Sequence, residues 1–189
     1  IHSPPSSMKL NSEYEKHIVK LIENKKILNF GISCNSINDA INFTNKYNFI
    51  TYIQINFNLL DRRGLDFFKI AKKNKIKIIS RAPFANGMIF KKNIVKNFTK
   101  SDFRIKYDKE FKDWLSIQII NLEKIKKNKK MISFALNFIL YHKYIDHIIP
   151  GMRSKNQVID VIKSLNDRPL TKTQINNIYK KIPVAYHGW

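Results

Sequence analysis

The stretch ITYIQIN at residues 50–56 is a short, β-branched and nearly continuous apolar run. Such a run is typical of a strand in a parallel sheet whose two faces are both covered. Similar runs occur at residues 27–33, ILNFGIS, and at residues 76–80, IKIIS. The three runs start about 25 residues apart, which is the length of one strand and one helix. The spacing therefore predicts a repeated strand–helix unit.

Helix-forming stretches separate these runs and continue beyond them. Residues 12–25 are expected to form a helix, because Ser12 and Glu15 match a capping box. Further helices are expected at residues 38–47, 62–74 and 157–165, and after a second capping box made by Thr171 and Gln174 beside Leu170 and Ile175, with Pro183 as the stop. Two more helices carry apolar stripes: Phe111, Trp114, Leu115, Ile119 and Leu122 in the first, and Ile132, Ala135, Leu136, Ile139 and Leu140 in the second.

A fourth strand is expected at residues 146–150, so the whole pattern predicts an α/β fold with a parallel sheet. An open doubly wound sheet and a closed eight-stranded barrel both satisfy this pattern. The sequence contains no glycine-rich GxGxxG fingerprint, which weakens the open-sheet interpretation. A (β/α)8 barrel needs about 250 residues. Four strands in 189 residues therefore amount to a partial barrel.

Composition limits the classes of protein that remain. A chain of 189 residues with 43% hydrophobic residues can build one domain with a core and is not disordered. The single cysteine, Cys34, excludes an internal disulfide and is compatible with a reducing cytosol. No apolar run reaches the roughly 20 residues of a membrane helix, and the first residues lack a secretory signal pattern. We therefore expect a cytoplasmic location and no membrane partner.

The formal net charge of +21 has two interpretations. One is a nucleic-acid-binding surface, which attracts phosphates through lysine and arginine. The other is a biased composition, because Lys, Asn and Ile dominate together and only six of the 35 basic residues are Arg. The lysines are scattered over nearly every expected helix, whereas nucleic-acid grooves prefer arginine and aromatic residues on one face. Composition is therefore favoured, and a basic nucleic-acid-binding module stays as an alternative.

Five short motifs occur in an order that resembles the aldo-keto reductase family. Residues 31–33 (GIS), 52–58 (YIQINFN), 81–87 (RAPFANG) and 148–154 (IIPGMRS) resemble the ends of its strands five, six, seven and eight. Residues 2–5 (HSPP) resemble the end of strand four, and residues 186–189 (YHGW) resemble the C-terminus of one bacterial branch. The resemblance implies a partial TIM barrel with strands five to eight and the end of strand four. Residues 1–189 would then be the C-terminal part of a single barrel domain whose N-terminal half is absent; the chain starts at Ile1 and not at Met.

The resemblance implies a catalytic place for His2. In the family, a histidine here lies beside a tyrosine acid and helps to orient the substrate carbonyl. A neutral imidazole can donate a hydrogen bond and can tune the pKa of its neighbour. Without the resemblance, His2 would be interpreted as a surface histidine. The Asp, Tyr and Lys of the same catalytic set belong upstream of Ile1, so this chain alone is expected to be inactive.

The resemblance also implies that Ser33 and Gln54 bind the carboxamide of a nicotinamide. Each residue falls at the C-terminal end of an expected parallel strand, where active sites of such barrels are built, and a hydroxyl with an amide can pair with both ends of a carboxamide. Arg81 stands where many members have an aromatic residue, so a guanidinium would stack on the cofactor or reach its phosphates. A buried amide and a structural salt bridge are the plainer interpretations of Gln54 and Arg81. Cys34 stands where the family often has Asn.

The remaining expected cofactor residues follow the third and fourth strands. Residues 86–108 form a stretch too long for an ordinary connection, which predicts a functional loop. Pro83, Phe84 and Gly87 lead into it, and Gly151, Arg153 and Gln157 follow the fourth strand. In this barrel class a phosphate site commonly forms after strands seven and eight. Arg153 suits a phosphate, Ser154 can cap the next helix, and the resemblance implies NADPH more than NAD. Val161 replaces an Asn that the family frequently has.

The function implied by the resemblance is that of an NAD(P)H-dependent oxidoreductase. Within a complete barrel it would reduce an aldehyde or ketone to an alcohol, or oxidise the matching alcohol. Two alternatives stay open: a non-catalytic, cofactor-binding regulatory subunit of the same family, and the basic nucleic-acid-binding module. The histidines His17, His142 and His147 have no ligand spacing, so no metal site is expected.

Overall fold

The computed structural model describes residues 1–90 and 100–186, apart from the side chain of Phe103. The chain forms two compact units, and neither unit is continuous in sequence. Unit 1 consists of Ile1–Asn56, Arg63–Arg81 and Lys143–Ile149. Unit 2 consists of Phe57–Arg62, Ala82–His142 and Pro150–Trp189.

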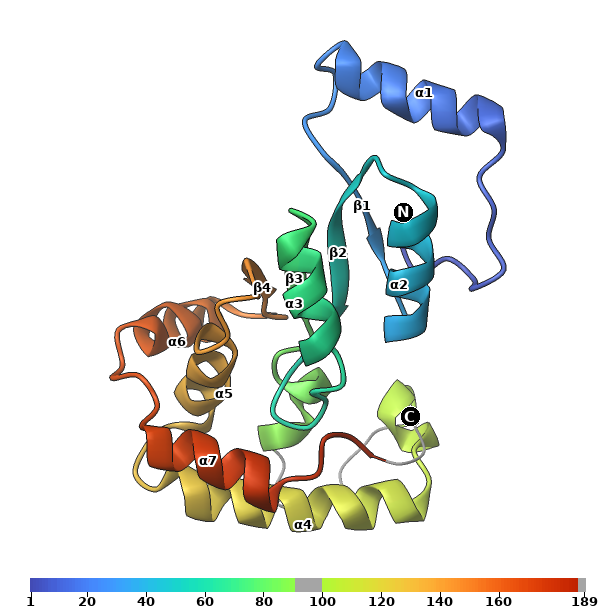
Figure 1. Ribbon diagram of the computed structural model, residues 1–189. Coiled ribbons are helices and arrows are strands. Elements are labelled where there is room, and N and C mark those ends of the chain that lie inside the picture. Colours follow the sequence, from blue (N-terminus) through green and yellow to red (C-terminus); the bar gives the residue numbers. More distant parts are fainter. Residues whose placement is uncertain (91–99, 187–189) are drawn as a thin grey trace. The chain divides into compact units, whose positions relative to one another are not determined.

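Unit 1 contains a four-stranded sheet, and every neighbouring pair of strands is parallel (Figure 1). The strands are β1 (Phe30–Ser33), β2 (Ile50–Asn56), β3 (Lys77–Arg81) and β4 (His147–Ile149), in this spatial order. The prediction of four parallel strands is thereby confirmed. Strand β1 begins later than expected, because the amides of Lys26 and Ile27 bond to the Leu21 carbonyl and Leu28 is 82% exposed.

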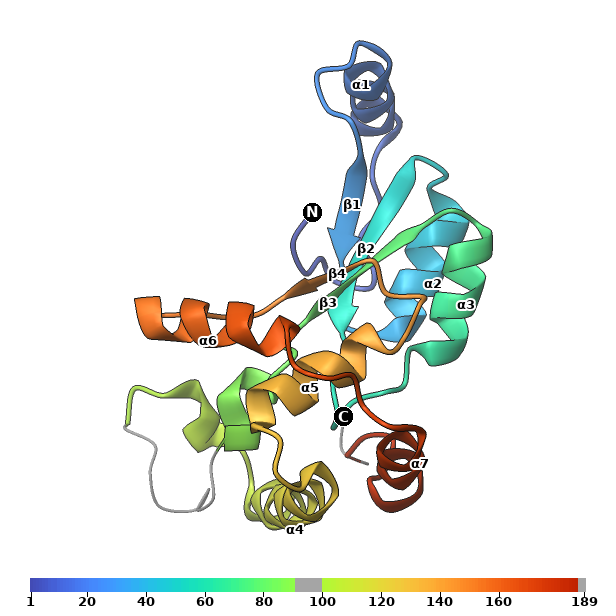
Figure 2. The same cartoon turned by 90° about the vertical axis from the view of Figure 1, so that its left-hand side faces the viewer.

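Helices α2 (Ile37–Lys46) and α3 (Leu65–Lys73) cover one face of this sheet (Figure 2). Strand β2 alternates accordingly. Ile53 and Ile55 are buried, whereas Tyr52 and Gln54 on the other face are half-buried. The expectation of a strand covered on both faces was therefore wrong for β2. The polar side chains are divided between the two faces: Gln54 lies away from the helices, whereas Ser80 is in register with Ile55 and is buried on the helix side.

Helix α1 (Ser12–Glu23) also belongs to unit 1 but carries no buried residue. In both ribbon views it lies apart from the sheet (Figures 1 and 2). Its N-cap is Asn11, whose side chain accepts a hydrogen bond from the Tyr14 amide at 2.8 Å. The prediction of a capping box at Ser12 was one residue too late, because Asn and Ser cap helices about equally well.

Unit 2 is helical. It contains α4 (Lys109–Lys126), α5 (Met131–Leu140), α6 (Lys155–Leu165) and α7 (Lys172–Lys181), and α5 packs against α4 and α6. The capping box at Thr171 and Gln174 is confirmed. Ala135, Leu136 and Ile139 of the stripe predicted for α5 are buried, but the prediction was wrong for Leu140, which is 54% exposed, and too narrow, since residues 133–139 are all buried. An all-round apolar helix belongs in a core.

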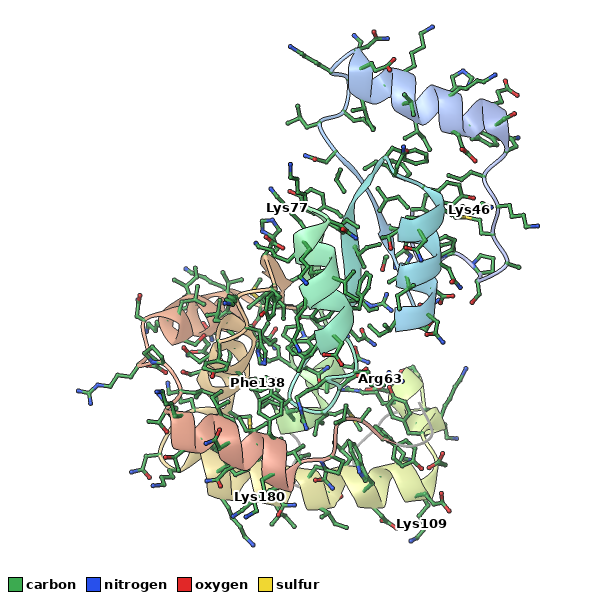
Figure 3. The ribbon with its side chains drawn as sticks, viewed as in Figure 1. Lys46, Arg63, Lys77, Lys109, Phe138 and Lys180 are labelled. Atoms are coloured by element: carbon green, nitrogen blue, oxygen red, sulfur yellow. The ribbon has the colours of Figure 1, made fainter. Side chains whose placement is uncertain are left out.

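The core of unit 2 centres on Phe138 of α5, labelled in Figure 3. Its ring stacks on Phe57 with centroids 5.9 Å apart and meets the His142 ring edge-on at 4.8 Å. His142 Nε2 lies 2.6 Å from the Tyr179 hydroxyl, and burial lowers the pKa of this histidine. His142 is thus a satisfied core residue, as its lack of ligand spacing indicated.

A buried arginine fastens residues 57–62 within unit 2. The Arg62 guanidinium donates to the carbonyls of Leu59 at 2.6 Å and Ile182 at 2.7 Å. Its backbone amide donates to the carbonyl of Val184 at 2.8 Å. The segment that follows β2 is therefore anchored to the chain that follows α7.

The stretch at residues 86–108 is more regular than predicted at its described ends. Short 3₁₀ turns within Ala85–Phe90 are interrupted by the positive φ of Asn86 and Gly87, and a 3₁₀ helix spans Phe103–Lys106. Residues 91–99 of the expected loop, and His187, Gly188 and Trp189 of the tail motif, lie outside the described residues. No helix in the described ranges is both long enough and apolar enough to cross a membrane.

Candidate functional site

Three of the expected cofactor residues meet at the carboxyl ends of the strands of unit 1. Ser33 ends β1, Arg81 ends β3, and Gln54 of β2 is in register with Ser33. The Ser33 hydroxyl donates to Gln54 Oε1 at 3.0 Å, and Arg81 Nη1 donates to Ser33 Oγ at 3.0 Å. The sheet therefore joins a hydroxyl, an amide and a guanidinium in one hydrogen-bonded cluster.

The guanidinium of Arg81 is held by neutral acceptors. Its Nε donates to Asn56 Oδ1 at 2.9 Å, and its Nη2 donates to the Cys34 carbonyl at 3.0 Å and to Asn35 Oδ1 at 3.3 Å. Its Nη1 also reaches Ser3 Oγ at 3.4 Å. No carboxylate in residues 1–90 or 100–186 pairs with it, and burial lowers its pKa. The positive charge at this end of the sheet is therefore uncompensated, which favours an anionic ligand.

Asn56 is part of this cluster but was not among the predicted site residues. It ends β2, is in register with Arg81, and shares a strand face with Gln54 two positions earlier. That period of two was the signal that could have identified it. Asn56 fixes the direction in which the Arg81 fork points.

His2 lies beside the same strand end. It forms an isolated parallel bridge with Ser33, and the Ser3 amide donates to the Ser33 carbonyl at 3.0 Å. The residue itself is exposed. The structure thus brings the one expected catalytic residue alongside the first of the expected carboxamide ligands.

Cys34 follows Ser33 and is fully buried. Its amide donates to the Gln54 carbonyl at 2.8 Å. Burial raises the pKa of the Cys34 thiol to about 12; Asp39 adds to the rise and Arg81 opposes it. The buried Cys34 side chain lies next to the cluster, and its raised pKa makes the thiol a poor nucleophile.

We expect native Cys34 to react with a disulfide reagent such as DTNB at pH 8 at least about a hundredfold more slowly than in urea, because the thiolate is scarce and the sulfur is covered. The native pKa is higher than that of a free thiol. The stabilisation from this group is therefore complete below about pH 8.5 and is lost as the pH rises towards 12. Cys34 is the only cysteine, so the whole signal reports on it. Equal rates in buffer and in urea would contradict the burial.

The expected residues after β3 belong to unit 2 and form a tight turn. Pro83 and Phe84 are buried, and the Gly87 amide donates to the Phe84 carbonyl at 2.9 Å. Gly87 adopts φ 79°, a left-handed conformation that side chains disfavour. Arg104 Nη1 donates to the Asn86 carbonyl at 2.9 Å. The turn is thus braced by a second arginine, Arg104, whose contact with Asn86 could not be predicted from the sequence.

The expected residues after β4 are all exposed. The Arg153 amide donates to Gln157 Oε1, and Ser154 caps α6 by accepting from the Gln157 amide at 3.3 Å. Arg104 holds the pKa of Asp102 at about 2, and Arg153 contributes to the same effect. Arg153 therefore lies within electrostatic range of Asp102.

Val161, the departure noted further along α6, is buried at 8% exposure and packs inward. The described parts of the chain contain no cluster of three His, Cys, Asp or Glu that could hold a metal ion.

Comparisons with known proteins agree with this arrangement of strands and motifs. The Aldo/keto reductase family matches residues 1–183. The uncharacterized oxidoreductase YqkF of Bacillus subtilis (strain 168) is 23% identical over 148 residues, which are 77% of this chain and 47% of that protein.

Two solved structures share the fold at 20% identity and a TM-score of 0.75. The apo form of aldo-keto reductase AKR11C1 from Bacillus halodurans aligns with 98% of this chain and 62% of its own. Glycerol dehydrogenase AKR11B4 from Gluconobacter oxydans aligns with 95% of this chain and 56% of its own. The chain therefore spans between 47% and 62% of the length of these three relatives.

Proposed function

Because this chain belongs to the aldo/keto reductase family, we propose that it carries the cofactor-binding residues of an NADPH-dependent oxidoreductase. The complete protein would interconvert a small aldehyde or ketone and its alcohol. The observation that carries the proposal is the hydrogen-bonded cluster of Ser33, Gln54 and Arg81 at the strand ends.

The barrel assignment is part of the same proposal. Strands β1–β4 would be strands five to eight of a closed barrel, and residues 1–189 the C-terminal part of that domain. The parallel bridge between His2 and Ser33 supports this assignment, because it adds the expected end of strand four beside β1. The partial chain length relative to its relatives supports it as well.

The cluster fits one end of a nicotinamide cofactor. A carboxamide presents one carbonyl oxygen and two N–H donors. The Ser33 hydroxyl, which donates to Gln54 Oε1 in this structure, would donate instead to the carboxamide oxygen, and Gln54 Oε1 would then accept from the N–H groups. Gln54 Nε2 has no hydrogen-bond partner within the described parts of the chain, so a further donor is available to a ligand. Arg81 adds a positive charge suited to an anionic dinucleotide.

Unit 2 would bind the phosphates of the adenosine half. Gly151, Arg153 and Gln157 stand at the N-terminus of α6, where backbone amides and the helix dipole favour an anion. The exposed guanidinium of Arg153 can form a bidentate hydrogen bond with a 2′-phosphate. This supports NADPH over NADH as the cofactor. Pro83, Phe84 and Gly87 would shape the backbone of the neighbouring phosphate turn.

The chemistry follows from these assignments. The bound cofactor would supply a hydride to the carbonyl carbon. His2 would hold the carbonyl oxygen by a hydrogen bond, and the proton would come from a tyrosine outside residues 1–189. The half-buried cluster around Arg81 would fix the position of the nicotinamide end.

The test is a fluorescence titration of this chain with NADPH and with NADH. We expect Arg153→Gln to weaken NADPH binding about tenfold or more and to affect NADH much less, because only NADPH carries the 2′-phosphate. The exposed Lys20→Gln is the charge-matched control and should change neither affinity. Gln54→Leu should weaken both cofactors.

Two outcomes would overturn the proposal. One is a chain that binds neither cofactor. The other is a complete protein that oxidises no NADPH with any member of a panel of aldehydes and ketones. A complete protein that binds NADPH without turnover would instead favour a regulatory subunit.

A further inference from the structure

A basic pocket of about 590 Å³ lies within unit 2, at the turn between α4 and α5. It is lined by the end of α4, by the turn at residues 127–130, by the second half of α6 and by Gln174 of α7. Two acidic residues, Asp160 and Asp167, line it. Six cationic residues do so: Lys126, Lys127, Lys129, Lys130, Lys163 and Arg168.

Within the described residues, two of the six cationic side chains make an ion pair or a hydrogen bond. Lys126 Nζ pairs with Glu123 at 3.1 Å and donates to the Lys129 carbonyl at 3.0 Å. Lys129 Nζ donates to the Arg168 carbonyl at 2.6 Å. In the described ranges, the other four side chains make no hydrogen bond and no ion pair; they are Lys127, Lys130, Lys163 and Arg168. Six cations and two carboxylates leave the pocket lining with a net positive charge of four.

The backbone adds to this field. Lys130 is the N-cap of α5, and its side chain does not cap the first turn. Ile132, in the first turn of α5, lines the pocket, and the amides at a helix start carry partial positive charge. Lys127 adopts φ 54° and ψ −122°, a conformation that a non-glycine residue adopts only when its surroundings impose it. The turn therefore holds a lysine at the cavity where a glycine would fit more easily.

We propose that this pocket binds a compact anion of the oligophosphate class, with three or more negative charges. Its volume lies in the range of about 300–1,000 Å³ typical of small-molecule sites. No aromatic residue lines it and only one arginine does, whereas single-stranded nucleic acid is usually bound by stacking on aromatic rings. A small polyanion is therefore the better match to the cavity.

This site is separate from the proposed cofactor residues and does not depend on them. Arg153 precedes the first turn of α6, whereas Lys163 lies in its last turn. Along a helix axis that separation is about 15 Å. NADPH and the oligophosphate should consequently bind without displacing each other.

The test is a calorimetric titration of this chain with sodium tripolyphosphate at low ionic strength. The pocket variant combines Lys127→Gln, Lys163→Gln and Arg168→Gln. The control combines Lys16→Gln, Lys20→Gln and Lys180→Gln; Lys180 is labelled on α7 in Figure 3. All six residues are exposed, so both variants should fold, and each loses three positive charges.

We expect one bound tripolyphosphate per chain, weakened about tenfold or more in the pocket variant and less than about twofold in the control. Equal weakening in the two variants would overturn the proposal, because the affinity would then reflect the overall charge of +21. Tighter binding of a single-stranded oligonucleotide that displaces tripolyphosphate would overturn it in favour of a nucleic-acid site. Unchanged NADPH affinity in saturating tripolyphosphate would support two separate sites.

Discussion

Replacing Phe138 by alanine is expected to lower the free energy of unfolding by about 3–5 kcal/mol. The Phe138 ring is fully buried and packs against Phe57, His142 and Tyr179, three side chains from different parts of the sequence. Removing it deletes apolar contacts and leaves a cavity that rigid helices fill only partly. Urea unfolding followed by circular dichroism measures the loss as a shift of the midpoint.

The matched control is Leu140→Ala in the same helix. Leu140 is 54% exposed, so its truncation should change stability by less than about 0.5 kcal/mol. Both variants place alanine in α5, so helix propensity cannot explain a difference between them. A similar small loss in the two variants would contradict the placement of Phe138 at the centre of the core.

Gly31→Ala is expected to destabilise the protein by about 1–3 kcal/mol, although a glycine-to-alanine change in a compatible place is usually mildly stabilising. A Cβ on Gly31 would lie 2.7 Å from both the Cβ and the carbonyl oxygen of Tyr52. Strands β1 and β2 would have to separate there. Because Ser33 lies two residues further along β1, its 3.0 Å hydrogen bond to Gln54 would lengthen and cofactor binding would weaken as well.

Gly151→Ala is the control for this substitution. A Cβ there has no atom within 4 Å and the backbone φ is not positive, so stability should stay the same or rise slightly. Thermal unfolding of the two variants side by side tests the close approach directly. A Gly31→Ala protein as stable as its parent would show that the strands are further apart than described.

Local signals in the sequence predicted local structure well. Strand β2 has the predicted bounds, and the Thr171 cap was found because its partner Gln174 is three residues away. Errors arose where distant contacts decide the outcome. Residues 27–29 had strand character but lead out of α1, and the burial of residues 133–139 of α5 depends on helices and loops that are distant in the sequence.

In the candidate site, too, local signals predicted some residues, whereas distant contacts decided the roles of others. Ser33, Gln54 and Arg81 could be proposed because they lie in motifs that resemble the family and near the carboxyl ends of parallel strands, which lie together. Ser33 was proposed as a site residue, but its contact with Arg81 and the four other acceptors of the guanidinium depend on how distant segments are arranged. Asn56 is the clearest example. The period of two that it shares with Gln54 indicates its strand face, but its role follows from being paired with Arg81 across β2 and β3.

Each unit is built from segments that are far apart in the sequence, so the order of synthesis on the ribosome decides when each unit can be completed. Strand β3 ends at Arg81, but its neighbour β4 begins only at His147, so one edge of the nascent sheet stays open while the residues between them are made. At about 5–20 residues per second, this exposure lasts on the order of several seconds. The hydrogen bond from Arg62 to the Ile182 carbonyl forms later still, because Ile182 lies 120 residues further along the chain. The speed of translation between the codons for β3 and β4, and the binding of chaperones to the open edge, therefore influence how much of the protein aggregates.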